Sequence, residues 1–211
     1  MFEEDSFVPS LNELSPAVTR EGKDRLAQDV SAQVISLDLV HPADESFLYQ
    51  TYASTRAEEM ALTGWNAEQQ ETFLRMQYEA QRRSYLMQLP EAKYWVIRCD
   101  QIAVGRLIIN RTPEEIHIVD IALLPEFRKQ GIGSTLMAAI MTEGSESGKT
   151  VRLHVERFNP ALHWYERLGF SAADAGPVYL EMIWRPSSQL SGSSAVVSEP
   201  EQASGVAHVS D

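Results

Sequence analysis

The sequence predicts a single α/β domain in which helices flank a mixed sheet, and three observations support this fold class. The hydrophobic spacing changes several times between the alternation of a strand and the period of a helix. Apolar residues make up 44% of the chain, a content typical of globular proteins. The chain has 211 residues, enough for one domain with a full core but a tight fit for two.

The first half of the domain is predicted to contain a strand, two helices and a β-hairpin. Residues 33–40 alternate in polarity, which predicts a strand ended by a His-Pro pair. Residues 44–62 and 66–89 are expected to be helices, the first capped by its initial aspartate. Residues 94–98 and 102–110 are two strands that form a hairpin by position, although the turn between them lacks ideal turn residues. Four side chains of the second helix recur at helical spacing and are expected to face the core: Phe73, Met76, Ala80 and Met87.

The second half is predicted to alternate strands with helices. Residues 116–124 form a strand, and a glycine-rich segment then opens a helix over residues 133–146. The remaining elements are expected at residues 151–156 (strand), 159–168 (helix) and 177–184 (strand), with a further short strand near Phe170 as an open alternative. The predicted order is therefore β-α-α-β-β-β-α-β-α-β, without an internal repeat.

The two ends of the chain differ in composition from this domain, which is expected to span residues 32–186. Residues 1–31 mix acidic residues, serine and proline with scattered apolar residues. Residues 187–211 are rich in Ser, Gly, Ala, Glu and Gln and contain no aromatic residue. Such segments bury too little apolar surface to offset the entropy lost on ordering. We therefore predict a flexible N-terminal extension and a disordered C-terminal tail.

The overall charge and the cysteine content narrow the function classes. A formal net charge of −12 repels nucleic acids and anionic membranes, so neither is an expected partner. The single cysteine, Cys99, excludes an intramolecular disulfide, and the sequence holds no Cys/His cluster typical of a zinc site. It also shows no apolar run of transmembrane length and no signal-peptide pattern. We expect a cytoplasmic protein without a bound metal.

The segment Arg128-x-x-Gly131-x-Gly133 leads from a strand directly into a helix and is suited to bind a pyrophosphate. Glycine has no Cβ, so backbone N–H groups can approach a bulky anion, and the helix N-terminus offers unpaired N–H donors. Arg128 and Lys129 would add charge-assisted contacts. The segment lacks both the GxGxxG fingerprint and the Lys-Ser/Thr end of a P-loop, which argues against dinucleotide or ATP binding. Taken alone, it also fits a turn that only packs tightly.

A second motif follows about 30 residues later and makes the pattern more specific. It is Asn159-Pro-Ala-x-x-x-Tyr165-x-x-x-Gly169-Phe170. Together, and in this order, the two motifs resemble the acyl-CoA motif and the following strand–helix motif of the GNAT superfamily of N-acetyltransferases. The resemblance spans about residues 33–184. It implies the GNAT fold, in which a mixed, largely antiparallel sheet is splayed at the acyl-CoA site.

The resemblance implies that acetyl-CoA is the co-substrate. The strand before the glycine loop would bond the pantetheine arm, and the loop amides would hold the pyrophosphate. Asn159 would contact the cofactor near the pantetheine, and Tyr165 would lie close to the thioester sulfur. Lys129 departs from the family pattern, in which glycine is common at this position, and makes the loop less permissive. The implied cofactor-binding residues are Ile121, Ala122, Leu123, Arg128, Lys129, Gln130, Gly131, Ile132, Gly133, Ser134, Asn159 and Tyr165.

The implied reaction is acetylation of an unidentified amine by direct attack within a ternary complex. The family uses a tyrosine to protonate the departing thiolate, which assigns this role to Tyr165; an aromatic ring that only packs against the sheet is the alternative. His154 is the first candidate for the general base, because histidine titrates near neutral pH. Asp120, aimed at the acceptor by a bulge in its strand, is the second, and His117 is the third. Proximity alone can also drive the transfer without a base.

The sequence does not define the acceptor. The acidic surface mildly favours a cationic amine, either a small molecule or a peptide. Pairing into a homodimer is an expectation from the family. The alternative function is a non-catalytic acyl-CoA sensor or interaction module, against which the presence of Tyr165 and His154 argues. In the family the first two helices and the last hairpin shape the acceptor site, which here implies Arg56, Glu58, Glu59, Trp65, Gln77, Tyr78, Arg82 and Tyr179.

Overall fold

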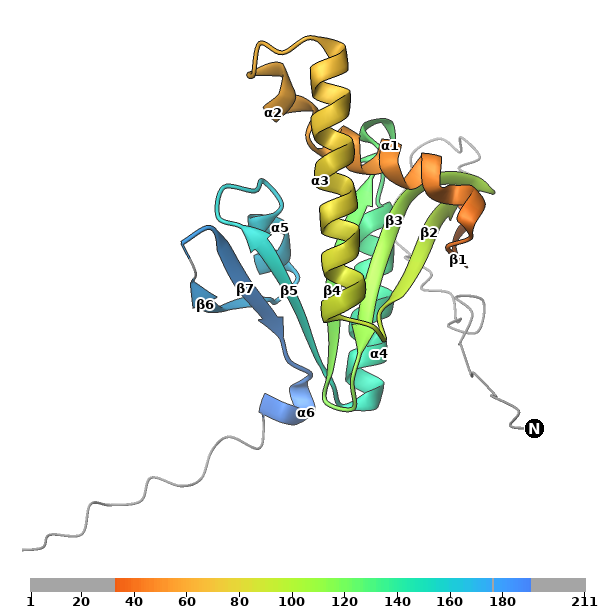
Figure 1. Cartoon of the computed structure of the whole chain (residues 1–211). Helices are drawn as coiled ribbons and strands as arrows, with labels where there is room; N and C mark the ends of the chain where they lie inside the picture. Colours follow the sequence, from red (N-terminus) through yellow and green to blue (C-terminus); the bar gives the residue numbers. More distant parts are fainter. Residues whose placement is uncertain (1–32, 176, 191–211) are drawn as a thin grey trace, which may run out of the picture.

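The computed structural model describes residues 33–175 and 177–190 and confirms the predicted fold class (Figure 1). A seven-stranded mixed sheet forms its centre, with the strand order β1-β2-β3-β4-β5-β7-β6. The neighbouring strands are antiparallel except for β4 and β5, which are parallel. Residues 1–31 and 191–211 of the predicted flexible ends lie outside the described residues.

The elements follow the predicted order, and the short strand near Phe170 is present as β6. The strands are β1 (Ile35–Leu39), β2 (Lys93–Cys99), β3 (Ile102–Arg111), β4 (Glu115–Leu123), β5 (Thr150–Glu156), β6 (Ser171–Ala175) and β7 (Tyr179–Trp184). The α-helices are α1 (Glu45–Thr55), α2 (Ala57–Ala61), α3 (Ala67–Gln88), α4 (Ile132–Ser147), α5 (Leu162–Arg167) and α6 (Ser187–Leu190). Two 3-10 turns, η2 (Pro42–Asp44) and η3 (Pro125–Phe127), precede α1 and α4.

Three helix boundaries differ from the prediction. The first helix is divided at Arg56, where the backbone leaves helical geometry with φ −106° and ψ 1°. The helix expected from residue 159 begins at Leu162, because the Asn159 side chain accepts a hydrogen bond from the Ala161 amide and holds a turn there. Helix α6 lies in the segment predicted to be a disordered tail. The side chain of Gln189 donates to the Gly148 carbonyl at 2.6 Å and ties α6 to the end of α4.

The predicted β2–β3 hairpin is confirmed, and its turn has favourable geometry despite its sequence. Asp100 and Gln101 both adopt left-handed conformations, with φ of 49° and 69°. Two residues in this conformation form the primed turn that matches the twist of a hairpin. The Asp100 side chain also accepts a hydrogen bond from the Val34 amide, and its own amide donates to the Val34 carbonyl. These bonds stabilise a turn that glycine would otherwise favour.

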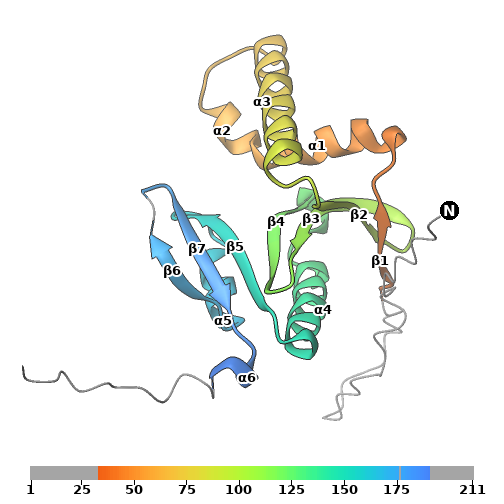
Figure 2. The ribbon, with the colours of Figure 1, turned by 60° about the horizontal axis from the view of Figure 1, so that its bottom comes forward.

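Helices cover both faces of the sheet (Figures 1 and 2). Helices α1 and α3 lie on one face, and α4 and α5 lie on the other. The core on the α4 face includes Ile97, Leu107, Ile116, Leu136, Met137 and Leu153. The core on the α3 face includes Leu48, Tyr52, Leu74, Tyr78 and Val96. Because successive strand residues point to opposite faces, Val96 and Ile97 belong to different cores and the centre of the sheet is buried on both sides.

The predicted core face of α3 is correct only at Phe73, which packs against the core on this side. Met76 and Met87 are 61% and 71% exposed, whereas Leu74 and Tyr78 are buried. The buried side of the helix packs on aromatic residues of α1: the Tyr78 ring lies 5.7 Å from that of Tyr49 and 5.5 Å from that of Tyr52. Both sets of residues have helical spacing, so the tyrosine cluster in the folded protein selects which side of α3 is buried.

Candidate active site

Strands β4 and β5 diverge halfway along their length. Their parallel ladder ends at Ile118 and Leu153, although both strands continue beyond these residues. Figures 1 and 2 show the two strands separating in this half of the sheet. The predicted cofactor strand, Ile121 to Leu123, lies in the diverging part, and within the described part of the chain it pairs only with β3. An extended ligand that adds itself to β4 here would find backbone groups that no neighbouring strand uses.

The predicted phosphate loop connects the end of β4 to α4. Arg128 is extended, and Lys129 and Gly131 follow with left-handed φ values of 60° and 89°. Left-handed residues in such a loop turn successive N–H groups toward one side and form a concavity for an anion. Helix α4 has no side-chain cap and no acidic residue in its first turn. Its first N–H groups therefore lack intrahelical partners and remain available: Ile132, Gly133 and Ser134.

Two side chains of the loop bond to nearby backbone carbonyls. The Arg128 guanidinium donates to the Leu123 carbonyl at 2.9 Å, and Gln130 donates to the Glu126 carbonyl at 2.5 Å. Both side chains therefore brace the loop. The left-handed backbone is the reason for a glycine at position 131. Lack of space is not the reason, because no atom would clash with a Cβ there.

A β-bulge is present in β4 next to Asp120, where the sequence predicts one. The pairing with β3 shifts between Ile118 and Asp120, which leaves Val119 as the additional residue. Both Ile118 and Ile121 consequently pack in the core on the α4 face. Asp120 is turned to the opposite face, where its carboxylate accepts a hydrogen bond from Arg106 at 2.6 Å. Without the bulge, strict alternation would have directed this carboxylate into the apolar core.

Arg106 is a residue of this region that the sequence analysis missed. Its side chain is only 6% exposed, and that of Asp120 is 21% exposed. The guanidinium also donates to Gln81 of α3 at 3.3 Å and lies 5.6 Å from the centre of the Tyr52 ring. The available signal was a lone arginine within the apolar run of β3, because a buried charge requires a partner. The partner that it finds is the second candidate for the general base.

Tyr165 lies on the α5 side of the diverging strands. Its side chain is buried, and its ring contacts the rings of Trp164 and Phe170 with centroid distances of 4.8 and 5.9 Å. Burial, followed by the negative charge of Asp120, raises the pKa of Tyr165 to about 12. The phenol is therefore protonated at neutral pH, as a proton donor must be.

His154 and His117 lie side by side on the α3 face of the sheet. Their ring centroids are 5.6 Å apart in an edge-on arrangement. His154 is exposed, and its Nε2 atom lies 4.0 Å from the Glu181 carboxylate of β7. His117 is buried, and its Nδ1 atom has no hydrogen-bond partner among the described residues. Burial, followed by the positive charges of Arg152 and His154, lowers the pKa of His117 to about 4. His154 is consequently the more accessible of the two candidate bases.

The stability of the protein is expected to fall as the pH drops from about 6.5 to about 4, in part because of His117. In this window the unfolded chain binds a proton at His117 that the folded protein does not bind, so the free energy of unfolding rises with pH. After a discount for partial solvent screening, the effect is on the order of 1–3 kcal/mol. His117→Leu is expected to flatten this part of the pH profile, measured by urea unfolding across the window. The exposed His163→Gln is the control, and equal pH slopes in the two variants would contradict the prediction.

The remaining predicted residues lie at different distances from this centre. Asn159 is exposed and caps the turn before α5, so its side chain is engaged with the backbone. Arg56, one of the residues expected to shape the acceptor site, bonds Glu59 at 2.9 Å and lies 3.6 Å from Glu156 at the end of β5. Gln77 accepts a hydrogen bond from Tyr52. Tyr78 and Arg82 line a separate pocket on the other side of Arg106.

Two searches of the described residues bear on other kinds of site. Within residues 33–175 and 177–190, no group of three or more His, Cys, Asp and Glu side chains is arranged to hold a metal ion. None of the helices in this part of the chain is long and apolar enough to cross a membrane.

The fold and the site together define a protein of the acyltransferase type, and comparison with protein families agrees. The profile of the acetyltransferase (GNAT) family matches residues 55–170, which is more than half of the chain. The protein therefore belongs to the GNAT acetyltransferase family. A search of curated proteins found no match to the sequence.

Solved structures share this fold at low sequence identity. The PaiA N-acetyltransferase of Thermoplasma acidophilum, in complex with coenzyme A, superposes with a TM-score of 0.56 at 18% identity, over 72% of this chain and 99% of that chain. An acetyltransferase of Thermus thermophilus gives a TM-score of 0.53 at 19% identity, over 72% of this chain and 96% of that chain. These similarities establish the fold of the protein.

Proposed function

We propose that this protein is an acetyl-CoA-dependent N-acetyltransferase in which an amine attacks the thioester directly within a ternary complex. The observation that carries the proposal is the position of the uncapped N-terminus of α4 immediately after the diverging part of β4. This arrangement offers N–H donors for a pyrophosphate and unpaired strand edges for an extended arm. The coenzyme A in the structure of the PaiA relative supports the same choice of co-substrate.

Different residues of the chain would bind different parts of acetyl-CoA. The backbone of Ile121 and Leu123 would bond the pantetheine arm, which requires the Arg128 side chain to release the Leu123 carbonyl. The released guanidinium would then be free to contact a phosphate, where charge-assisted bonds are stronger than bonds to a neutral carbonyl. The loop amides from Arg128 to Ser134 would surround the pyrophosphate. Binding of acetyl-CoA would thus replace the bond from Arg128 to the Leu123 carbonyl by a bond from Arg128 to the ligand.

Two side chains on opposite faces of the sheet would carry out the proton transfers of the reaction. Tyr165 would donate its hydroxyl proton to the departing thiolate, since its phenol is held protonated. His154 would accept the proton of the attacking amine, because it is exposed beside the diverging strands and has no short hydrogen bond among the described residues. Asp120 is less suited to this task, since Arg106 occupies its carboxylate. Its proposed role is structural, as the partner that compensates the buried charge of Arg106.

The acceptor is proposed to be a cationic small-molecule or peptide amine. Carboxylates gather on the α3 face around His154: Glu115 and Glu181 contact Arg152, and Glu156 stands near the end of β5. Their charges would attract an ammonium ion, which then has to lose a proton before it attacks. The single cysteine of the chain fits a reducing, cytoplasmic setting for this reaction.

The binding part of the proposal is tested by adding one negative charge at the N-terminus of α4. Ser134→Asp is expected to weaken acetyl-CoA binding by about 10- to 100-fold through repulsion of the pyrophosphate. The variant should remain folded, because an acidic residue in the first turn stabilises a helix. The measurement is isothermal titration with acetyl-CoA. Thr142→Asp, which adds the same charge on the exposed part of the same helix, is the matched control. Equal affinities for the two variants would refute this phosphate site.

A further inference from the structure

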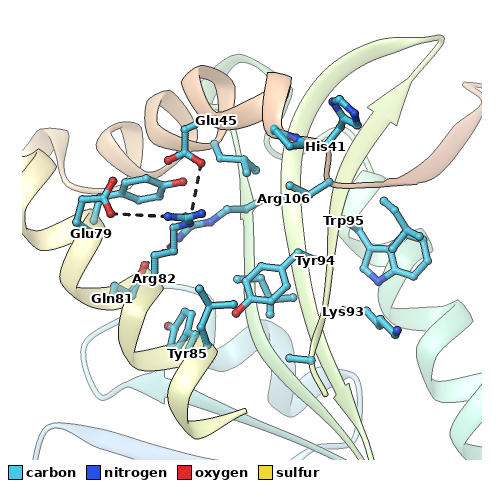
Figure 3. A pocket seen from close by; sticks show the side chains of 18 residues that line it. His41, Glu45, Glu79, Gln81, Arg82, Tyr85, Lys93, Tyr94, Trp95 and Arg106 are labelled. Atoms are coloured by element: carbon cyan, nitrogen blue, oxygen red, sulfur yellow. Dashed lines mark hydrogen bonds and ion pairs between the residues drawn. The ribbon is translucent and has the colours of Figure 1, made fainter. Parts of the chain in front are cut away.

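A second pocket lies on the α3 face of the sheet, apart from the diverging strands (Figure 3). It has a volume of about 730 Å³ and is bounded by α3, the start of α1, and strands β2 and β3. Its walls are mainly apolar and aromatic and include Leu48, Tyr78, Tyr85 and Ile108. Pockets of this size and lining typically accept a small organic molecule. The reaction proposed above does not use it.

This pocket is distinct from the proposed acetyl-CoA site. None of its lining residues belongs to the phosphate loop, to β4, to β5 or to α5. Arg106 forms the boundary between the two regions, since it lines the pocket and pairs with Asp120 on the other side. The Arg106 guanidinium is already engaged by Asp120 and Gln81, so it is not the group that a ligand in the pocket would recognise.

The hydroxyl of Tyr94 is an unpartnered polar group at this pocket. Its oxygen is buried and forms no hydrogen bond with the described residues. Figure 3 shows this hydroxyl directed from β2 toward α3. Burial raises the pKa of Tyr94, so the phenol keeps its proton and serves as a donor. A buried hydroxyl without a partner is destabilising, and an acceptor atom that reaches it would recover the lost free energy.

Arg82 of α3 supplies the charge next to this hydroxyl. Arg82 lines the same pocket as Tyr94, and its positive charge opposes the effect of burial on the pKa of Tyr94. The guanidinium lies 3.8 Å from Glu79 and 4.0 Å from Glu45, too far for hydrogen bonds (Figure 3). Both contacts are half-exposed, and such ion pairs contribute little. Arg82 thus has two long ion pairs and no hydrogen bond among the described residues, so its planar set of N–H donors can still form a bidentate pair with another carboxylate.

We infer that this pocket binds a small apolar or aromatic molecule that carries a carboxylate. The carboxylate would accept hydrogen bonds from the Tyr94 hydroxyl and the Arg82 guanidinium, and the apolar body would pack against Leu48, Tyr78 and Ile108. A small shift of the flexible Arg82 side chain gives the carboxylate access to Tyr94. An amine of the same shape would meet the like charge of the guanidinium, which disfavours its binding. The inference does not depend on the proposed acetyl transfer.

The test is isothermal titration of the full chain, without acetyl-CoA, with three probes of the same length: 3-phenylpropionate, 3-phenylpropanol and 3-phenylpropylamine. We expect saturable binding of the carboxylate and at least about tenfold weaker binding of the alcohol and the amine. Arg82→Gln and Tyr94→Phe should each weaken binding of the carboxylate probe by about fivefold or more. Arg83→Gln, at an exposed neighbouring position, should leave this affinity unchanged. Tyr94→Phe should stay folded, because it removes an unpaired hydroxyl and keeps the ring.

Five outcomes would overturn the inference, and the first four concern the probes and the control variant. These are equal binding of the three probes, preference for the amine, equal weakening by Arg83→Gln, and no saturable binding up to about 10 mM. The fifth is unchanged affinity for the carboxylate probe in both Arg82→Gln and Tyr94→Phe, which would show that the probe binds outside this pocket.

Discussion

Replacement of Tyr165 by phenylalanine is expected to lower kcat for acetyl transfer by about 10²- to 10⁴-fold. The substitution removes only the hydroxyl, and the ring keeps its contacts with Trp164 and Phe170. The departing thiolate then has no proton donor beside it. The affinity for acetyl-CoA should stay nearly unchanged, because the phosphate loop and the edge of β4 are not altered. The measurement is release of free thiol from acetyl-CoA with a panel of amines and N-terminal peptides.

A matched control is available in Tyr49. Its ring is also buried, and burial together with its hydrogen bond to Glu71 raises its pKa to about 12 as well, but it lies on α1. Tyr49→Phe is expected to lower stability by about 1 kcal/mol and to leave kcat unchanged. If kcat of the Tyr165→Phe enzyme is close to that of the wild type, Tyr165 is not the general acid. Binding of acetyl-CoA without turnover of any amine by the wild-type protein would favour the sensor function instead.

Loss of the Asp120 carboxylate is expected to lower the free energy of unfolding by about 3 kcal/mol. In Asp120→Ala the Arg106 guanidinium would remain almost fully buried with only Gln81 as a hydrogen-bond partner. An uncompensated buried charge is costly, whereas a buried pair replaced on both sides is often tolerated. The double variant Asp120→Leu with Arg106→Met should therefore recover most of the lost stability. Chemical denaturation of the three variants measures both effects.

The surface pair of Arg111 and Glu143 provides the comparison. Glu143 accepts two hydrogen bonds from Arg111, at 2.7 and 2.8 Å, but both side chains are partly exposed. Glu143→Gln is expected to cost at most about 1 kcal/mol. An Asp120→Ala variant that is as stable as Glu143→Gln but inactive would contradict a structural role for Asp120 and return it to the position of general base.

The agreement between sequence and structure is best where the signal is local. The strands and the glycine loop are confirmed, because strand alternation and glycine before a helix depend on neighbouring residues. The bulge at Val119 was anticipated as the feature that would aim Asp120. The break at Arg56 and the late start of α5 at Leu162 were missed, since capping bonds decide boundaries that hydrophobic spacing leaves open.

The errors concern contacts between segments that are distant in the chain. The buried side of α3 was assigned to Met76 and Met87, but docking on Tyr49 and Tyr52 turned Leu74 and Tyr78 inward. The partner of Asp120 was not foreseen, because Arg106 belongs to the preceding strand and reaches it only through the register of β3 with β4. The burial of His117 beside His154 likewise depends on the parallel pairing of β4 with β5.

The sequence by itself determined the class of fold, the glycine loop before α4 and the family, because these depend on short motifs whose backbone requirements are local. Only the tertiary structure decided how the titratable groups divide their roles. It paired Asp120 with Arg106, left His154 exposed, buried His117 and Tyr165, and formed the pocket under α3. Protonation and charge pairing depend on burial and on distances across the sheet, and these quantities exist only once the strands have packed together.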